Sequence, residues 1–96
     1  MFEKVLKLFR ERIVARRLVL TLHAVEELEA DRLSIYDVEQ AILTGKITHR
    51  QRDENSGEWK YVVRGQTVTH DEVVVVAKLS ATDKLVIITI YGEADK

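Results

Sequence analysis

Residues 73–77 read VVVVA, and this run decides the class of fold. Four consecutive valines favour a strand, and a strand without polar positions has no face suited to water. We therefore expect a central strand here. The apolar residues at 85–91 follow a polar turn and predict a second buried strand beside it.

Two further strands are expected before the central strand. Apolar and polar residues alternate weakly over 46–52, which predicts an edge strand. Residues 59–64 are predicted to form the strand that pairs with it. The residues between them, 53–57 (DENSG), have the composition of a hairpin loop. Residues 46–91 thus predict an antiparallel meander.

The N-terminal half is predicted to be helical. Apolar residues recur at helical spacing over 1–17 and leave basic side chains outside, which predicts a basic amphipathic helix. Thr21 can cap a helix over residues 22–31. Ser34 begins an S-x-x-D variant of the capping box, which predicts another helix that ends at Thr44.

These elements predict an α+β fold in which two or three N-terminal helices pack on a four-stranded antiparallel sheet. The short run at 18–20 (LVL) is either a brief strand or an extended entry to the next helix. With 96 residues, the chain is expected to be a single domain, 1–96. It divides into the basic helix of 1–17, a helical pair at 18–45 and the meander at 46–91.

The composition excludes several classes of protein. The chain has no cysteine, which removes disulfides, thiolate nucleophiles and cysteine-based zinc sites. No apolar run approaches the roughly 20 residues of a membrane span, and the first residues lack the apolar core of a signal peptide. We therefore expect a cytoplasmic protein without membrane contact, and the sequence indicates no cofactor.

The charges are segregated along the chain although the net charge is only −1. Basic residues dominate 1–17, acidic residues dominate 18–45, and basic residues dominate 46–64. Such segregation can build a positive face on a nearly neutral protein. Solvated helix faces have the same pattern, so both interpretations stay open.

His23 is the first candidate functional residue, because it lies in the first turn of a predicted helix. The positive end of the helix dipole disfavours the protonated imidazole, which leaves the ring able to accept a proton. The simpler alternative is a half-buried histidine that only packs and forms hydrogen bonds. His49 and His70 lie near predicted loops without metal-ligand spacing, so no metal site is expected.

A series of short motifs runs through residues 18–91. In order, they are Thr21, His23-Ala24, Glu27-Leu28, Leu33-Ser34, Asp37-Val38, Ala41-Ile42, Gly45, Ile47, Lys60-Tyr61, Gly65 and residues 87–91 (IITIY). In this order and spacing they resemble the family called domain of unknown function 4258.

The resemblance implies a fold like that of RelE-type ribonucleases, with N-terminal helices packed on an antiparallel sheet. Members of that wider group are commonly toxins of bacterial toxin–antitoxin pairs, which cleave messenger RNA without a metal. The resemblance thus implies RNA and a cognate antitoxin as partners, in some cases an antitoxin with a zinc-binding domain. Two features depart from the pattern. Glu27 and Asp31 stand where many members have arginines, and the chain lacks the strongly basic charge of RelE-type toxins.

Metal-free RNA cleavage needs a base for the ribose 2′-hydroxyl, an acid for the leaving oxygen and cations for the charge on phosphate. The candidate catalytic residues are His23, Lys60, Arg64 and Tyr91. The candidate RNA-binding residues are Arg50, Arg52, Trp59 and Tyr61. Lys60 and Arg64 share one strand face and can point toward a common groove, which His23 reaches only if its helix packs beside it.

Each of these candidates has a simpler alternative. Lys60 and Arg64 can be the wet face of a half-exposed strand, Tyr91 can be a core residue, and Trp59 can anchor the sheet. Two functions therefore remain open. The first is a toxin-like, metal-independent endoribonuclease acting on messenger RNA. The second is a non-catalytic protein-interaction module that keeps the fold, which the acidic residues Glu27 and Asp31 favour.

Overall fold

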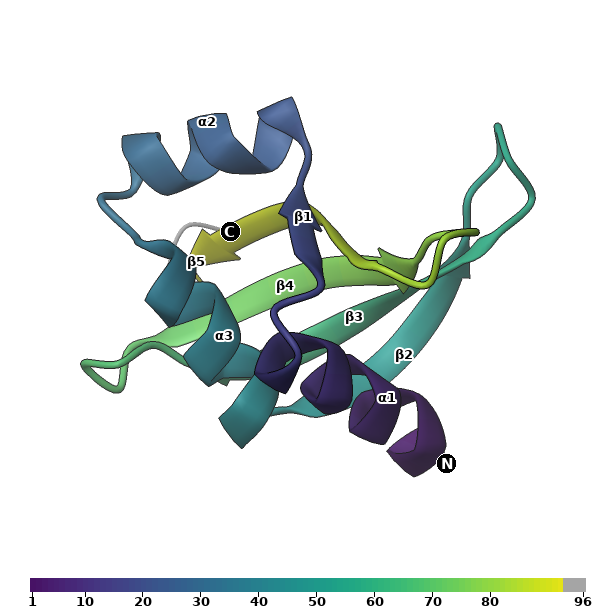
Figure 1. Ribbon diagram of the computed structural model, residues 1–96. Coiled ribbons are helices and arrows are strands. Elements are labelled where there is room, and N and C mark those ends of the chain that lie inside the picture. Colours follow the sequence, from purple (N-terminus) through teal and green to yellow (C-terminus); the bar gives the residue numbers. More distant parts are fainter. Residues whose placement is uncertain (93–96) are drawn as a thin grey trace.

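Within residues 1–92, which the computed structural model describes, the chain forms three helices and one five-stranded sheet (Figure 1). The elements are α1 (Glu3–Val14), β1 (Leu18–Leu20), α2 (Leu22–Ala30), α3 (Ile35–Thr44), β2 (Lys46–Arg52), β3 (Trp59–Gln66), β4 (Glu72–Leu79) and β5 (Leu85–Gly92). None of the helices in this part of the chain has the length and apolarity of a membrane span. The last residues of the predicted domain, 93–96, lie outside the described residues.

The strand order is β1-β5-β4-β3-β2, with β4 in the centre as the valine run predicts. Strands β2 to β5 form the predicted antiparallel meander. Strand β1, however, pairs in parallel with β5, where Leu18 lies opposite Leu85. The sheet is therefore five-stranded and mixed, and the predicted four-stranded antiparallel sheet is wrong. Of the two alternatives for residues 18–20, the brief strand is confirmed. The sequence could not choose between them, because a run of three residues carries no periodicity and its partner lies far along the chain.

Helix α2 begins where the sequence predicts, and its cap also joins it to the sheet. The hydroxyl of Thr21 accepts a hydrogen bond from the backbone N–H of Ala24 at 3.1 Å. The same hydroxyl donates to the carbonyl of Ile88 at 3.0 Å. Because Ile88 belongs to β5, one side chain starts the helix and fixes it against the edge of the sheet.

Helix α3 is attached to the sheet through Asp37, which is only 8% exposed. One carboxylate oxygen accepts from the backbone N–H of Ser34 at 2.9 Å, as the predicted capping box requires. The other oxygen accepts from the backbone N–H of Val68 at 3.1 Å. Asp37 thus joins the start of α3 to the turn between β3 and β4.

Replacing Asp37 by alanine is expected to lower the free energy of unfolding by about 1–3 kcal/mol, because it leaves buried N–H groups without an acceptor. Urea unfolding followed by circular dichroism measures this change. Glu39→Ala, on the same helix, is the control and is expected to stay within about 0.5 kcal/mol of the wild type. Equal losses in the two variants would contradict the role assigned to Asp37.

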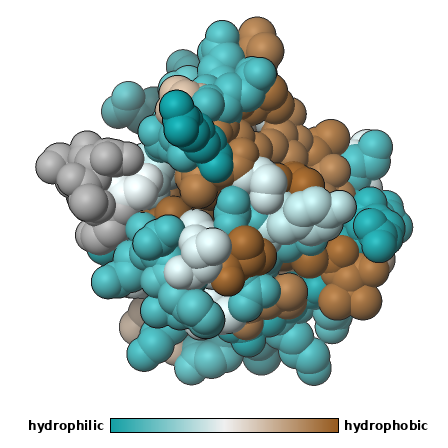
Figure 2. All heavy atoms as spheres, turned by 90° about the vertical axis from the view of Figure 1, so that its left-hand side faces the viewer, coloured by the Kyte–Doolittle hydropathy of each residue, from teal (hydrophilic) through white to brown (hydrophobic). Residues whose placement is uncertain are grey.

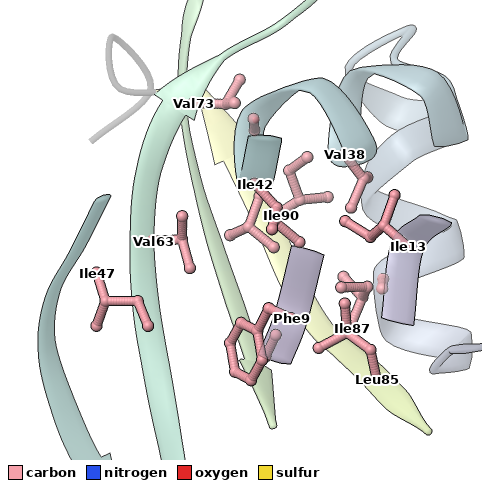
Figure 3. Packing of buried hydrophobic residues seen from close by; sticks show 14 of the residues in the cluster. Phe9, Ile13, Val38, Ile42, Ile47, Val63, Val73, Leu85, Ile87 and Ile90 are labelled. Carbon is pink, nitrogen blue, oxygen red and sulfur yellow. The ribbon is translucent and has the colours of Figure 1, made fainter. Parts of the chain in front are cut away.

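The main core lies between the helices and one face of the sheet (Figure 3). Phe9 and Ile13 of α1 and Ile42 of α3 meet the strands there, and all three are buried. A second, smaller cluster lies on the other face of the sheet. It consists of Val62, Val74 and Val76, with Ile88 and Tyr91 packed against it. This second face, which we call the open face, therefore has an apolar floor.

Two arginines of α1 are used in contacts within the fold. Arg10 donates to the carbonyl oxygens of Ile42 and Gly45 at 3.0 and 2.9 Å, at the C-terminal end of α3. Arg12 pairs with Asp83 at 2.7 Å, and the hydrogen bond from its guanidinium lowers the pKa of Asp83 below the ordinary value. Part of the positive charge of the predicted basic helix is therefore already engaged within the protein.

Candidate functional site

The open face of the sheet carries a pocket with a volume of about 320 Å³. It is lined by His49, Gln51, Lys60, Val62, Arg64, Val76, Ile88, Thr89 and Tyr91. The valines and Ile88 make an apolar floor, and the polar side chains surround it. Four strands contribute to the lining, so the pocket depends on the whole meander.

The strand register sets which side chains of the pocket are neighbours. His49 of β2 lies opposite Val62 of β3, Val62 lies opposite Val76 of β4, and Val76 lies opposite Thr89 of β5. These four residues form one row across the sheet. Directly opposite residues have Cβ atoms about 5 Å apart, which places the imidazole next to Val62.

Two cations flank the same valine along β3. Lys60 precedes Val62 by two residues and Arg64 follows it by two, so each lies about 7 Å along the strand on the same face. Tyr91 lies in the same row as Arg64, with β4 between them. An anion placed over Val62 is therefore within side-chain reach of an imidazole, an ammonium group and a guanidinium group.

Among the described residues that line this pocket, two side chains are cationic and none is acidic. The neighbouring Lys78 is neutralised by Glu58, whose carboxylate lies 2.8 Å from the ammonium group. The hydrogen bond from Lys78 lowers the pKa of Glu58, which keeps that carboxylate charged. Lys60 makes no such ion pair within residues 1–92, so its charge is available to attract anions.

A β-bulge brings His49 into the pocket. Ile47 lies opposite Val63 in the core, and strict alternation would put His49 on that same face. The register shifts between these two residues, so Thr48 is an extra residue and His49 faces the pocket. The sequence does not single out His49 for this reason, since a bulge leaves no clear signal where apolar and polar residues alternate so weakly.

The bulged residue also orients the imidazole. The hydroxyl of Thr48 lies 3.0 Å from Nδ1 of His49 and 3.4 Å from the carbonyl oxygen of Val62. Contact at Nδ1 fixes the ring, so Nε2 is the nitrogen that would exchange a proton with a bound molecule.

His23 does not line the pocket. Its side chain is 66% exposed, and Nε2 lies 3.4 Å from the carboxylate of Glu27. The same carboxylate accepts from the backbone N–H of Ile90 at 2.9 Å and from the hydroxyl of Thr89. His23 therefore reaches the pocket only indirectly, through Glu27 and Thr89.

Glu27 has a structural role at this edge of the sheet. Strand β1 pairs with β5 only as far as Ile87, and α2 continues along the edge beyond that point. The carboxylate of Glu27 accepts the Ile90 N–H, which no strand satisfies there. An acidic residue at this position is thus explained by the fold.

All four predicted RNA-binding residues lie on the helix-covered side of the sheet. Tyr61 packs edge-on against Phe2 and Phe9 of α1, with ring centroids 6.1 and 5.8 Å apart. The guanidinium carbons of Arg50 and Arg52 lie 3.9 and 4.2 Å from the ring centroid of Trp59.

The predicted site residues are therefore divided among several places. Lys60, Arg64 and Tyr91 meet in the pocket on the open face. The arginine pair and the tryptophan lie on the opposite face of the β2–β3 hairpin, and Tyr61 contacts the core. The only predicted catalytic residue outside the pocket is His23, and the structure offers His49 in its place.

Comparison with known families finds a match between residues 20–92 and the model described as Domain of unknown function (DUF4258). The chain belongs to this family. Neither a curated protein nor a solved structure matches the chain significantly. The DUF4258 region holds all the described residues that line the pocket, as well as the bulge at Thr48. Helix α1 precedes that region, so the candidate site belongs to the DUF4258 domain itself.

Proposed function

We propose that this DUF4258 protein is a toxin-like endoribonuclease that cleaves messenger RNA without a metal ion, on a RelE-like fold. One observation carries the proposal. An imidazole, an ammonium group and a guanidinium group surround Val62 in a pocket whose described lining holds no acidic residue, and the phenol of Tyr91 also lines it. These are the groups that metal-free phosphodiester cleavage needs.

In the proposed reaction, Nε2 of His49 takes the proton of a ribose 2′-hydroxyl. The 2′-oxygen then forms a bond to phosphorus while the bond from phosphorus to the 5′-oxygen breaks. Lys60 and Arg64 stabilise the charge that builds on the phosphate oxygens, and the guanidinium can hold two of them at once. Tyr91 gives its proton to the leaving 5′-oxygen. The products are a 2′,3′-cyclic phosphate and a 5′-hydroxyl.

The strand order supports this division of roles. His49 lies on β2 and Tyr91 on β5, so base and acid stand on opposite sides of the two cations of β3. Opposite placement suits an in-line displacement, in which the nucleophile enters on one side of phosphorus and the leaving group departs on the other.

Incubation of the purified protein with single-stranded RNA and with ribosome-bound messenger RNA, in the presence of a chelator, tests the proposal. The expected result is cleavage that leaves 2′,3′-cyclic phosphate ends. RNA with a 2′-deoxyribose at the cut position should stay intact, because it lacks the nucleophile. If neither RNA is cut and expression does not arrest growth, the proposal is wrong.

Replacing Thr48 by valine is expected to lower the cleavage rate about fivefold, the equivalent of one hydrogen bond of about 1 kcal/mol. Valine keeps the β-branched shape but has no hydroxyl to form a hydrogen bond with Nδ1 of His49. Thr48→Ser keeps the hydroxyl and should restore most of the rate. A similar loss in both variants would show that the hydroxyl does not position the imidazole. Single-turnover cleavage of a labelled oligonucleotide provides the rates.

The proposal includes a cognate antitoxin, in line with the family resemblance, and such a partner could carry a zinc-binding domain. The neighbouring reading frame is the place to look for it. Co-expression of that frame should restore growth and block cleavage by the purified pair.

A second function, a non-catalytic interaction module, is favoured by apolar side chains at the end of the molecule formed by α2 and α3. Leu22 is 75% exposed and Tyr36 is 66% exposed. Figure 2 shows this end, where hydrophobic surface lies among polar side chains. Absence of RNA binding even at low salt, where phosphate contacts are strongest, would favour this function over the nuclease.

A further inference from the structure

We infer that Trp59 stacks on one base of a single-stranded RNA, at a second contact on the face of the β2–β3 hairpin opposite the pocket. The inference deepens the proposed function and rests on it for the choice of RNA as the ligand. It names the class of substrate, because a base inside a duplex is not free to stack on a protein side chain.

Trp59 is not part of the hydrophobic core of the described residues. The side chain is half-buried, and it belongs to neither of the two hydrophobic clusters within residues 1–92. Tyr61, two residues along the same strand, packs against the main core through Phe2 and Phe9. Trp59 is the first residue of β3 and follows the hairpin loop, which projects away from the helices in Figure 1.

Positively charged side chains lie over the indole. Arg50 and Arg52 both lie over the ring, and neither forms an ion pair with any residue of the described part of the chain. Arg52 is held in place, since it donates to the carbonyl of Gly57 at 2.8 Å. The contact of Arg50 is with the indole itself. A base can therefore take the place of Arg50 on the ring, and the released guanidinium can bind the adjacent phosphate.

Strand β2 lies at the edge of the sheet, which brings the pocket and Trp59 close to one edge. After the bulge, successive side chains of β2 alternate between the two faces of the sheet. His49 and Gln51 therefore line the pocket, while Arg50 and Arg52 lie beside Trp59 on the other face. A flexible single strand that crosses this edge contacts both faces. One nucleotide would then lie in the pocket and a neighbouring nucleotide on the indole.

Trp59 is the only tryptophan of the sequence, so its fluorescence reports on this contact alone. The probe is a single-stranded RNA oligonucleotide with 2′-O-methyl groups, which binds without being cleaved. We expect saturable quenching of Trp59 by this strand and little quenching by the duplex of the same sequence. Polyglutamate, which offers charge without bases, should not quench.

Affinities of a labelled strand for variants, measured by fluorescence anisotropy, complete the test. Trp59→Leu should weaken binding about tenfold, the scale of one stacked base, while Trp59→Phe should stay within about threefold of the wild type. Tyr36→Leu, which removes an exposed aromatic ring on α3, is the control and should bind normally. Circular dichroism establishes that each variant is folded.

The outcomes separate this inference from the proposed function. Cleavage of RNA without quenching, or equal affinity of the wild type and Trp59→Leu, would overturn the stacking site and leave the nuclease intact. Quenching by single strands without any cleavage would support the stacking site and count against the nuclease. Equal quenching by polyglutamate would show a surface for acidic peptides, and this too would overturn the inference.

Discussion

Replacing His49 by alanine is expected to lower the rate of RNA cleavage by about 10² to 10⁴-fold, the usual contribution of a positioned general base. The side chain is exposed and contacts Thr48 at the bulge, so its removal should leave the fold and the affinity for RNA nearly unchanged. The loss is therefore expected in the rate of the chemical step and not in binding. Single-turnover kinetics on a labelled RNA measure the two separately.

His23→Ala is the decisive comparison, because sequence analysis assigns the imidazole role to His23 and the structure favours His49. His23 acts on the pocket only through Glu27 and Thr89, so its removal should lower the rate by less than about tenfold. His70→Asn, in the turn between β3 and β4, controls for the loss of an imidazole that is not among the described residues lining the pocket. A larger loss for His23→Ala than for His49→Ala would reverse the assignment.

Replacing Gly65 by alanine is expected to lower the free energy of unfolding by at least about 3 kcal/mol, at the upper end of overpacking effects. A Cβ atom on Gly65 would lie 2.0 Å from the carbonyl oxygen of Ala41 in α3. A backbone carbonyl cannot rotate away as a side chain can, so α3 would have to move off β3. Because β3 carries Lys60 and Arg64, such a movement should also reduce binding of RNA to any folded fraction.

Gly57→Ala is the matched control for this change. Gly57 has a positive φ of 74° in the hairpin loop, but a Cβ atom there meets nothing within 4 Å. Only the unfavourable positive φ opposes an alanine at this position. Gly57→Ala is therefore expected to lower the free energy of unfolding by about 1–2 kcal/mol. Midpoints of urea unfolding give both values. Equal destabilisation in the two variants would contradict the close approach of α3 to β3 as the cause.

Much of the fold follows from local patterns in the sequence. The edge strand Lys46–Arg52 has the predicted bounds, the valine run lies in the central strand, and Thr21 caps α2. Period, turn composition and capping chemistry are properties of neighbouring residues, so a single sequence reveals them.

The features that the sequence did not reveal all depend on contacts between distant segments. Strand β1 is defined by its partner β5, and residues 21–84 separate the two strands. Arg10 belongs to the outer face of α1 by its helical position, yet it caps α3. The bulge at Thr48 follows from pairing with β3, and it reverses the faces of every later residue of β2. Because of this shift, the side chain of His49 lies in the candidate site, and the side chain of Arg50 lies on the face opposite the open face.

The parallel pairing of β1 with β5 has a consequence for synthesis of the protein. The ribosome makes Leu18–Leu20 early, but the strand that receives it, together with Thr89 and Tyr91, emerges much later. Contacts between such distant segments form slowly, because a long loop must close, at a cost in entropy, before these contacts can stabilise the fold. A nascent chain that ends before residue 85 thus lacks both the closing edge of the sheet and one wall of the pocket. The candidate site should become complete only after translation has passed β5.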